Sequence, residues 1–269
     1  MNKVAAIQMC SSADVDENLR SAEYWIEEAA SNGARLIVLP EMFAIMGIHK
    51  TDKVAVQESF GHGKIQQFLS EQARKYRVWI VGGTIPISST DKHKIRAAML
   101  VYDDQGKVAA RYDKMHLFDV VLSETESYKE SDTIEPGNDL VVVQTPVGKL
   151  GLAVCYDVRF PELFRRLSQQ GAEIFALPSA FTVKTGAAHW ELLTRSRAVE
   201  NFCYLMGAGQ GGTHANGRQT YGHSLIVEPW GSVCAQQNKM SPGVIYTTID
   251  LTYLNKIRQS IPALQHRRM

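Results

Sequence analysis

NGARLIVLPEMF, at residues 32–43, decides the fold, because a closely similar segment, QGAEIFALPSAF, returns at residues 170–181. Each copy has a glycine that can end a helix, an apolar run long enough for one buried strand, and a Leu-Pro pair before the chain turns polar. A second echo relates YRVWIVGG, residues 76–83, to NFCYLMGA, residues 201–208. The sequence therefore predicts two similar halves of helices and strands, packed sheet against sheet with their helices outside.

Strands and helices alternate along the rest of the chain as well. Apolar runs that predict buried strands, and periodic segments that predict amphipathic helices, occupy residues 3–9, 16–31, 64–76, 78–87, 149–157, 160–169 and 188–201. Turn sequences at residues 104–106 and 146–148 separate pairs of apolar runs and predict antiparallel hairpins. We therefore expect an α/β protein in which both β-sheets are mixed.

The composition bounds the class of protein. The 269 residues carry a formal net charge of +1, and 45% of them are hydrophobic and 21% charged, which leaves no basic surface for nucleic acid. No apolar run approaches the roughly 18 residues of a membrane helix, and acidic residues appear too early for a signal peptide. Four cysteines without CxxC spacing predict free thiols. We expect one cytoplasmic domain over residues 1–269, with neither a membrane nor a nucleic acid as partner.

Three reactive side chains follow apparent strands. Glu41 comes directly after the apolar run at residues 36–40, Lys114 follows the strand that ends in RYD, and Cys155 ends the run LGLAVC. Taken singly, each is explained as a solvated strand end or a small core residue. Together they supply a base, a cation and a nucleophile, and ligands of α/β sheets bind at the carboxyl ends of strands. The set therefore indicates acyl transfer.

A set of longer motifs runs through nearly the whole chain. In order, these motifs are LPEMF, KMHLFD, YKESDTIEPG, GLAVCYDVRFPELFR, LPSAFTVKTGAAHW, RSRAVENFCYLM and YGHSLIVEPWG. In this order and spacing they resemble the carbon–nitrogen hydrolase family usually called the nitrilase superfamily. The resemblance implies a single-domain, four-layer αββα sandwich with two mixed β-sheets packed face to face, whose subunits associate as homodimers or larger homo-oligomers.

The resemblance also implies catalytic roles. The family's glutamate, lysine and cysteine correspond to Glu41, Lys114 and Cys155. Its second glutamate corresponds to Glu130, which would orient Lys114 and tune the general base, although a solvated loop glutamate explains it as well. The expected enzyme is an amidase that hydrolyses the C–N bond of a small carboxylate-bearing amide through a thioester on Cys155, releasing ammonia or an amine. It needs no metal and no organic cofactor.

Four further residues are expected to contact the substrate, namely Tyr156, Arg159, Phe181 and Thr182. The backbone N–H of Tyr156 would meet the oxyanion together with Lys114. Arg159 would bind a substrate carboxylate through its guanidinium fork, although a local ion pair explains it equally. Phe181 and Thr182 follow the second Leu-Pro strand and would line the pocket, although Phe181 also fits a core position.

Some motifs bear on the substrate. LPEMFAIMG, ESDTIEPG, SAFTVKTGAAHWELLTRSRA and the terminal HRR resemble the branch of deaminated glutathione amidases, with ω-amidases acting on 2-oxoglutaramate as the competing branch. A substrate of either kind carries a carboxylate, which Arg159 or Arg197 would face. Loops at residues 42–51, 118–131 and 211–221 are expected to shape the pocket. Nitriles are a chemically adjacent class of substrate.

Other functions are weighed against this one. GAGQGG at residues 207–212 fits a dinucleotide-binding pattern, but no helix-forming segment follows it. A cysteine–histidine hydrolase would need a histidine beside Cys155, and a non-catalytic assembly module would leave that thiol unreactive. The histidines available for such a pair include His116, His189, His214 and His223. No HExxH or clustered Cys/His spacing indicates a metal site.

Overall fold

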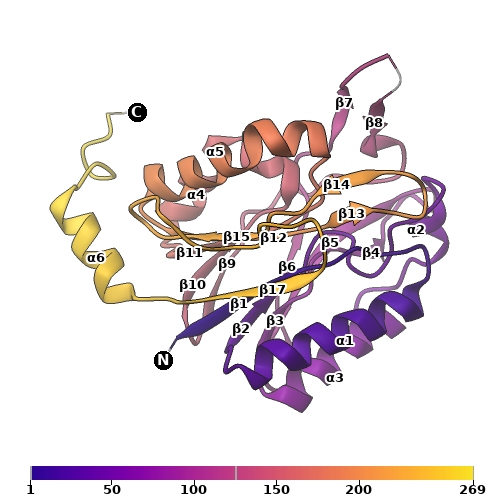
Figure 1. Cartoon of the computed structure of the whole chain (residues 1–269), viewed down its shortest axis with the longest axis horizontal. Coiled ribbons are helices and arrows are strands. Elements are labelled where there is room, and N and C mark those ends of the chain that lie inside the picture. The colour runs from indigo at the N-terminus through magenta and orange to yellow at the C-terminus, as the bar shows by residue number, and fades with distance from the viewer. Residues whose placement is uncertain (1, 125, 269) are drawn as a thin grey trace.

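The computed structural model describes residues 2–124 and 126–268. Two β-sheets pack face to face, and helices cover the outer face of each sheet (Figure 1). Both sheets contain parallel and antiparallel strand pairs. The fold is therefore the four-layer αββα sandwich that the sequence predicts.

The first sheet comes mainly from the N-terminal half of the chain. Its strands are β17 (Gly243–Thr248), β1 (Lys3–Gln8), β2 (Leu36–Val38), β3 (Trp79–Val81), β5 (Ile95–Tyr102) and β4 (Ile85–Ser88), with β6 (Val108–Asp113) also paired to β5. Helices α1 (Val15–Ser31) and α3 (Lys64–Tyr76) cover its outer face (Figure 1). Because β17 pairs with β1, the C-terminal region closes the edge of this sheet.

The second sheet comes from the C-terminal half. Its order is β16 (Val233–Gln236), β15 (Leu225–Val227), β12 (Tyr204–Gly209), β11 (Ile174–Ser179), β10 (Gly148–Leu152) and β9 (Val142–Thr145), covered by α4 (Pro161–Gln169) and α5 (Val183–Asn201). At one end of the sandwich lie the short helix α2 (Asp52–Ala55) and the hairpins β7–β8 (Asp119–Val121, Ser127–Lys129) and β13–β14 (Gly211–Thr213, Gln219–Tyr221). Helix α6 (Leu251–Ser260) lies at the other end (Figure 1).

Side-chain alternation gives the strands two buried faces. In β1, Val4 and Ala6 pack into the core between the sheets, whereas Ala5 and Ile7 pack against the helical layer. Because both faces of such strands are covered, they read as continuous apolar runs rather than as alternating patterns. This explains why short apolar runs predicted the sheets.

The repeat in the sequence is also a repeat in strand register. Leu36 pairs with Trp79 where β2 meets β3, and Ile174 pairs with Tyr204 where β11 meets β12. Leu36 and Ile174 are equivalent positions in the first pair of similar segments, and Trp79 and Tyr204 are equivalent positions in the second pair. The helices before β3 and β12 both end on a residue with left-handed backbone, Arg77 and Phe202 respectively. These two residues occupy equivalent positions in the second pair of similar segments. The two halves are therefore built alike.

The structure corrects some element boundaries. The single strand expected at residues 78–87 is two strands, broken at Gly82 and Gly83. Gly83 has a φ of +53°, and a Cβ atom there would collide with the carbonyl oxygen of Pro40, next to Glu41. Helix α5 begins at Val183, five residues before the expected start at residue 188, because the Thr182 side chain caps it.

Other expectations hold. GAGQGG leads from β12 into strand β13 instead of opening a helix, so it lacks the helix N-terminus that a dinucleotide pyrophosphate needs. All four cysteines are free thiols. Within residues 2–124 and 126–268, each helix is too short or too polar to cross a membrane.

Gly83→Ala is expected to lower the free energy of unfolding by about 3 kcal/mol, because the methyl group adds a collision with Pro40 to left-handed backbone strain. Gly33→Ala is the matched control, since Gly33 has a φ of +82° but no atom within 4 Å of an added Cβ, and a loss of about 1 kcal/mol is expected there. Urea unfolding measures both. Equal losses in the two variants would contradict the close approach to Pro40.

Candidate active site

Four side chains from separate parts of the sequence meet at one end of the sandwich. Glu41 follows β2, Lys114 follows β6, Cys155 follows β10, and Glu130 begins the 3₁₀ helix η1 (Glu130–Asp132) after β8. The Lys114 ammonium donates to Glu41 Oε1 at 2.8 Å and to Glu130 Oε2 at 2.7 Å. The structure thus brings together all four residues expected to be catalytic.

Lys114 is a buried cation held between two carboxylates. Its side chain is 1% exposed, and those of Glu41 and Glu130 are 4% and 16% exposed. Burial alone would lower the pKa of Lys114, but Glu130 and Glu41 outweigh it and raise that pKa well above its usual value. Burial likewise pushes the pKa of Glu130 upward, yet Lys114 and the N–H of Phe118 hold it below its ordinary range. Lys114 and Glu130 are therefore charged at neutral pH.

Cys155 stands at a strained corner between β10 and the 3₁₀ helix η2 (Cys155–Arg159). Its φ of +46° is a left-handed conformation that costs a non-glycine residue roughly 1–2 kcal/mol. The N–H of Ala180 lies 3.5 Å from its sulfur. Burial and the negative charge of Glu41 raise the pKa of the Cys155 thiol well above its ordinary value, against the opposing effect of Lys114. The resting site therefore holds a thiol beside a carboxylate, which is the arrangement that general-base activation requires.

Asp157 fixes the corner relative to Lys114. Its buried carboxylate accepts hydrogen bonds from the Val154 N–H at 2.8 Å and the Tyr112 hydroxyl at 2.7 Å. It also accepts one from the His116 N–H at 3.1 Å and lies 2.7 Å from His116 Nδ1. Tyr112 and His116 flank Lys114 in the sequence, so one carboxylate ties the lysine segment to the cysteine corner. The contact with the Val154 N–H is the helix-start contact that the sequence suggests for Asp157, whereas the contacts with Tyr112 and His116 were not anticipated.

A narrow pocket opens over Cys155. The four expected substrate contacts line it, together with Ala180 and Thr185, which were not anticipated, and with Phe118 and Arg218, which belong to two of the loops expected to shape the pocket. The Arg159 guanidinium lies 5.8 Å from the centre of the Tyr156 ring and 5.5 Å from that of Phe181, which places a cation at the pocket wall. Phe181 also belongs to the hydrophobic core, as the alternative expectation had it. Thr182 additionally caps α5.

Arg197 does not face the pocket, and the expectation that it could bind a substrate carboxylate is wrong. Its Nε donates to the Val158 carbonyl at 2.8 Å, and its NH1 group pairs with Glu200 at 2.8 Å. Its side chain is 8% exposed. The buried guanidinium therefore fastens α5 to the segment after Cys155.

The histidines considered for a cysteine–histidine pair have other surroundings. No histidine of the described residues lines the pocket over Cys155. His116 stacks on Phe160 with ring centres 3.7 Å apart, and His214 lies 2.8 Å from the Ser11 carbonyl. His189 approaches Arg159 at 3.3 Å, and His223 approaches the Tyr221 carbonyl. The titratable neighbour that lines this pocket beside the thiol is the Glu41 carboxylate rather than an imidazole.

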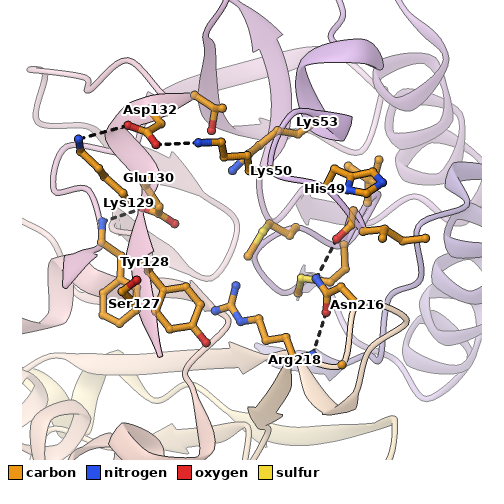
Figure 2. A pocket seen from close by; sticks show the side chains of 18 residues that line it. His49, Lys50, Lys53, Ser127, Tyr128, Lys129, Glu130, Asp132, Asn216 and Arg218 are labelled. Carbon is orange, nitrogen blue, oxygen red and sulfur yellow. Dashed lines mark hydrogen bonds and ion pairs between the residues drawn. The ribbon is translucent and has the colours of Figure 1, made fainter. Parts of the chain in front are cut away.

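A larger cavity of about 660 Å³ adjoins the narrow pocket, with Phe118, Glu130 and Arg218 common to both (Figure 2). We call this cavity the vestibule. Its walls come largely from the three loops predicted to shape the pocket, at residues 42–51, 118–131 and 211–221. Lys53 of α2 also lines it and was not anticipated. Over the described part of the chain, no group of three His, Cys, Asp or Glu side chains is placed to hold a metal ion.

Comparisons with known proteins agree with this geometry. A family profile described as carbon–nitrogen hydrolase matches residues 3–259. A protein of Yersinia enterocolitica named deaminated glutathione amidase is 43% identical over 98% of this chain and 92% of its own length. The crystal structure of the Caenorhabditis elegans NitFhit protein has a TM-score of 0.92 at 37% identity, covering 99% of this chain and 65% of that one. Saccharomyces cerevisiae Nit3, described as a member of branch 10 of the nitrilase superfamily, has a TM-score of 0.89 at 33% identity, with 99% and 96% coverage.

Asp157→Asn is expected to lower kcat at least about tenfold and the free energy of unfolding by about 2–4 kcal/mol, because one carboxylate oxygen accepts from the Val154 N–H and the other from the His116 N–H, so the amide NH2 faces a backbone donor in either orientation. Tyr112→Phe removes one of the hydrogen bonds, and a loss of about 1 kcal/mol is expected. Steady-state kinetics with chemical denaturation checks both variants. Normal kcat in Asp157→Asn would contradict a positioning role.

The charge state of Cys155 is a separate prediction. Because its pKa is raised, ultraviolet thiolate absorbance, measured against Cys155→Ser, is expected only above the ordinary thiol value of about pH 8.5. Glu41→Gln removes the neighbouring negative charge and is expected to move the transition to lower pH. A thiolate already present near pH 7 in the unsubstituted protein would overturn this account of the resting site.

Proposed function

Because this chain belongs to the carbon–nitrogen hydrolase family, we propose that it is a cysteine amidase of deaminated glutathione with Glu41, Lys114 and Cys155 as its catalytic residues. The observation that carries the proposal is the buried meeting of thiol, carboxylate and ammonium. Hydrolysis of an amide needs a nucleophile, a group that takes and returns a proton, and a cation for the oxyanion. The site holds one group for each task.

The first half-reaction forms a thioester. Cys155 attacks the amide carbonyl as Glu41 takes its proton, and Lys114 with the Tyr156 N–H stabilises the oxyanion. The C–N bond then breaks, Glu41 returns the proton to the leaving nitrogen, and an amine departs. Glu130 acts by holding Lys114, as their 2.7 Å contact supports.

The second half-reaction releases the acid. Glu41, ionised again, takes a proton from water, and the hydroxide attacks the thioester carbonyl. The C–S bond breaks, and the sulfur recovers a proton from Glu41. Acid and amine are formed from amide and water, so the balance needs no cofactor.

The substrate follows from the names of the relatives. Deaminated glutathione has a keto oxygen in place of the γ-glutamyl amino group, so hydrolysis of its γ-amide gives 2-oxoglutarate and cysteinylglycine. 2-Oxoglutaramate gives the same acid with ammonia as the leaving group. In both, Arg159 at the wall of the narrow pocket is the proposed partner of the keto-acid carboxylate.

The setting of the enzyme is also part of the proposal. We propose that the whole chain works as one domain, in the cytoplasm, as a homodimer or larger homo-oligomer. A core cluster shared by both sheets supports a single domain, and four free thiols support a reducing compartment. Exposed apolar side chains of Leu192, Val199 and Trp230 support association.

Release of 2-oxoglutarate from deaminated glutathione is expected in the unsubstituted protein and to fall at least about 1000-fold in Cys155→Ala, Glu41→Gln and Lys114→Met. Cys203→Ala is the matched control, since Cys203 is also buried but accepts a hydrogen bond from Arg258 and does not line the pocket. Activity that survives in Cys155→Ala would exclude the thioester route. Release from neither deaminated glutathione nor 2-oxoglutaramate would remove the proposed substrates.

A further inference from the structure

The vestibule beside the catalytic pocket carries an excess of positive charge. Its cationic side chains are Lys50, Lys53, Lys129 and Arg218, and its carboxylates are Glu130 and Asp132. Both carboxylates are already engaged, Glu130 by Lys114 and Asp132 by Lys50 and Lys129. The remaining cations, Lys53 and Arg218, have no carboxylate partner among the described residues.

Lys53 is the less expected of the two. It is half-buried in α2, and its ammonium makes no hydrogen bond or ion pair within residues 2–124 and 126–268. Burial lowers its pKa, with Glu130 opposing and the cations Lys114 and Arg218 reinforcing the effect. A partly buried ammonium has lost part of its hydration, which costs free energy unless an anion lies beside it.

Arg218 is also incompletely satisfied. One NH2 hydrogen bond goes to the Ala180 carbonyl at 2.7 Å, and the guanidinium lies 5.0 Å from the centre of the Tyr128 ring. Its Nε is buried and has no hydrogen-bond partner among the described residues. In Figure 2, Lys53 and Arg218 reach into the vestibule from two sides, one from α2 and the other from the β13–β14 hairpin.

Lys53 and Arg218 lie on the side of the site where the leaving group of the substrate is expected to extend. Glu41 must reach the leaving nitrogen, so the leaving group departs past this carboxylate. Lys53 lines a small cavity together with Glu41 and Glu130, whereas Arg159 lines the narrow pocket over Cys155. The keto-acid end therefore lies towards Arg159, and the leaving group extends into the vestibule. A volume of about 660 Å³ is far more than ammonia needs and is in the range of cavities that enclose organic ligands.

We infer that Lys53 and Arg218 form an anion subsite for a carboxylate on the leaving amine, so that the enzyme selects amides whose leaving group is an anionic peptide. The inference rests on the proposed amidase function and deepens it. Deaminated glutathione offers such a carboxylate on its terminal glycine, whereas 2-oxoglutaramate has none. A charge-assisted contact of this kind favours the first substrate over the second.

The test is the ratio of kcat/KM for deaminated glutathione to kcat/KM for 2-oxoglutaramate. Lys53→Met keeps the apolar stem and removes the charge, and it is expected to lower the ratio at least about tenfold, in line with loss of one charged hydrogen bond. Lys75→Met is the matched control, because Lys75 lies on α3 away from the vestibule, is 54% exposed and is already paired with Glu23. Its ratio is expected to stay within about twofold.

A second substrate makes the test independent of any folding defect. Deaminated glutathione with its glycine carboxylate converted to a carboxamide should lose at least about tenfold in kcat/KM with the unsubstituted protein, and Lys53→Met should no longer matter for it. An unchanged ratio in Lys53→Met, or equal hydrolysis of acid and carboxamide, overturns the subsite and leaves the amidase function standing. Hydrolysis of neither natural substrate by the unsubstituted protein overturns the proposed function and the subsite with it.

Discussion

The buried ammonium of Lys114 is the constraint on which the rest of the site depends. It is 1% exposed and is neutralised by Glu41 and Glu130 at 2.8 and 2.7 Å. Removing a partner from a buried charge typically costs about 3–5 kcal/mol. The two ion pairs of Lys114 therefore hold together the segments that follow β2, β6 and β8. The same charges decide the chemistry. Burial and the carboxylate of Glu41 raise the pKa of the Cys155 thiol, so in the proposed mechanism the proton leaves the sulfur as attack occurs and passes to Glu41.

A further carboxylate, that of Asp157, connects the cysteine corner to the lysine segment. It accepts hydrogen bonds from the Val154 N–H and from Tyr112 and His116, which flank Lys114 in the sequence. Two pockets adjoin this centre. The narrow pocket with Arg159 suits a small acyl group, and the vestibule suits a larger leaving group. In the proposed mechanism, catalysis thus depends on residues that follow the strands, and selection between substrates depends on residues of the loops.

The sequence predicted the layers because buried strands and amphipathic helices leave local patterns, and the two echoes even matched the strand register. It also placed Glu41, Lys114 and Cys155 together, because each follows a strand that enters a sheet. The pocket walls were harder to predict. Arg218 and Lys53 lie in loops and a one-turn helix without periodicity, so nothing local distinguishes them from solvated surface residues. The prediction for Arg197 was wrong because a position in a helix does not show whether an arginine faces a ligand or bonds to a neighbouring segment of the protein, as Arg197 does with the Val158 carbonyl.

The most direct test of the account is acid-quenched mass spectrometry of the protein during turnover of deaminated glutathione. The account predicts a 2-oxoglutaryl adduct on the peptide that contains Cys155, because cysteinylglycine has left and the acyl group remains as a thioester. The adduct should be absent in Cys155→Ala and should accumulate when deacylation is slowed. Turnover without any adduct, together with hydrolysis that survives in Cys155→Ala, would contradict the central claim that this thiol carries the reaction.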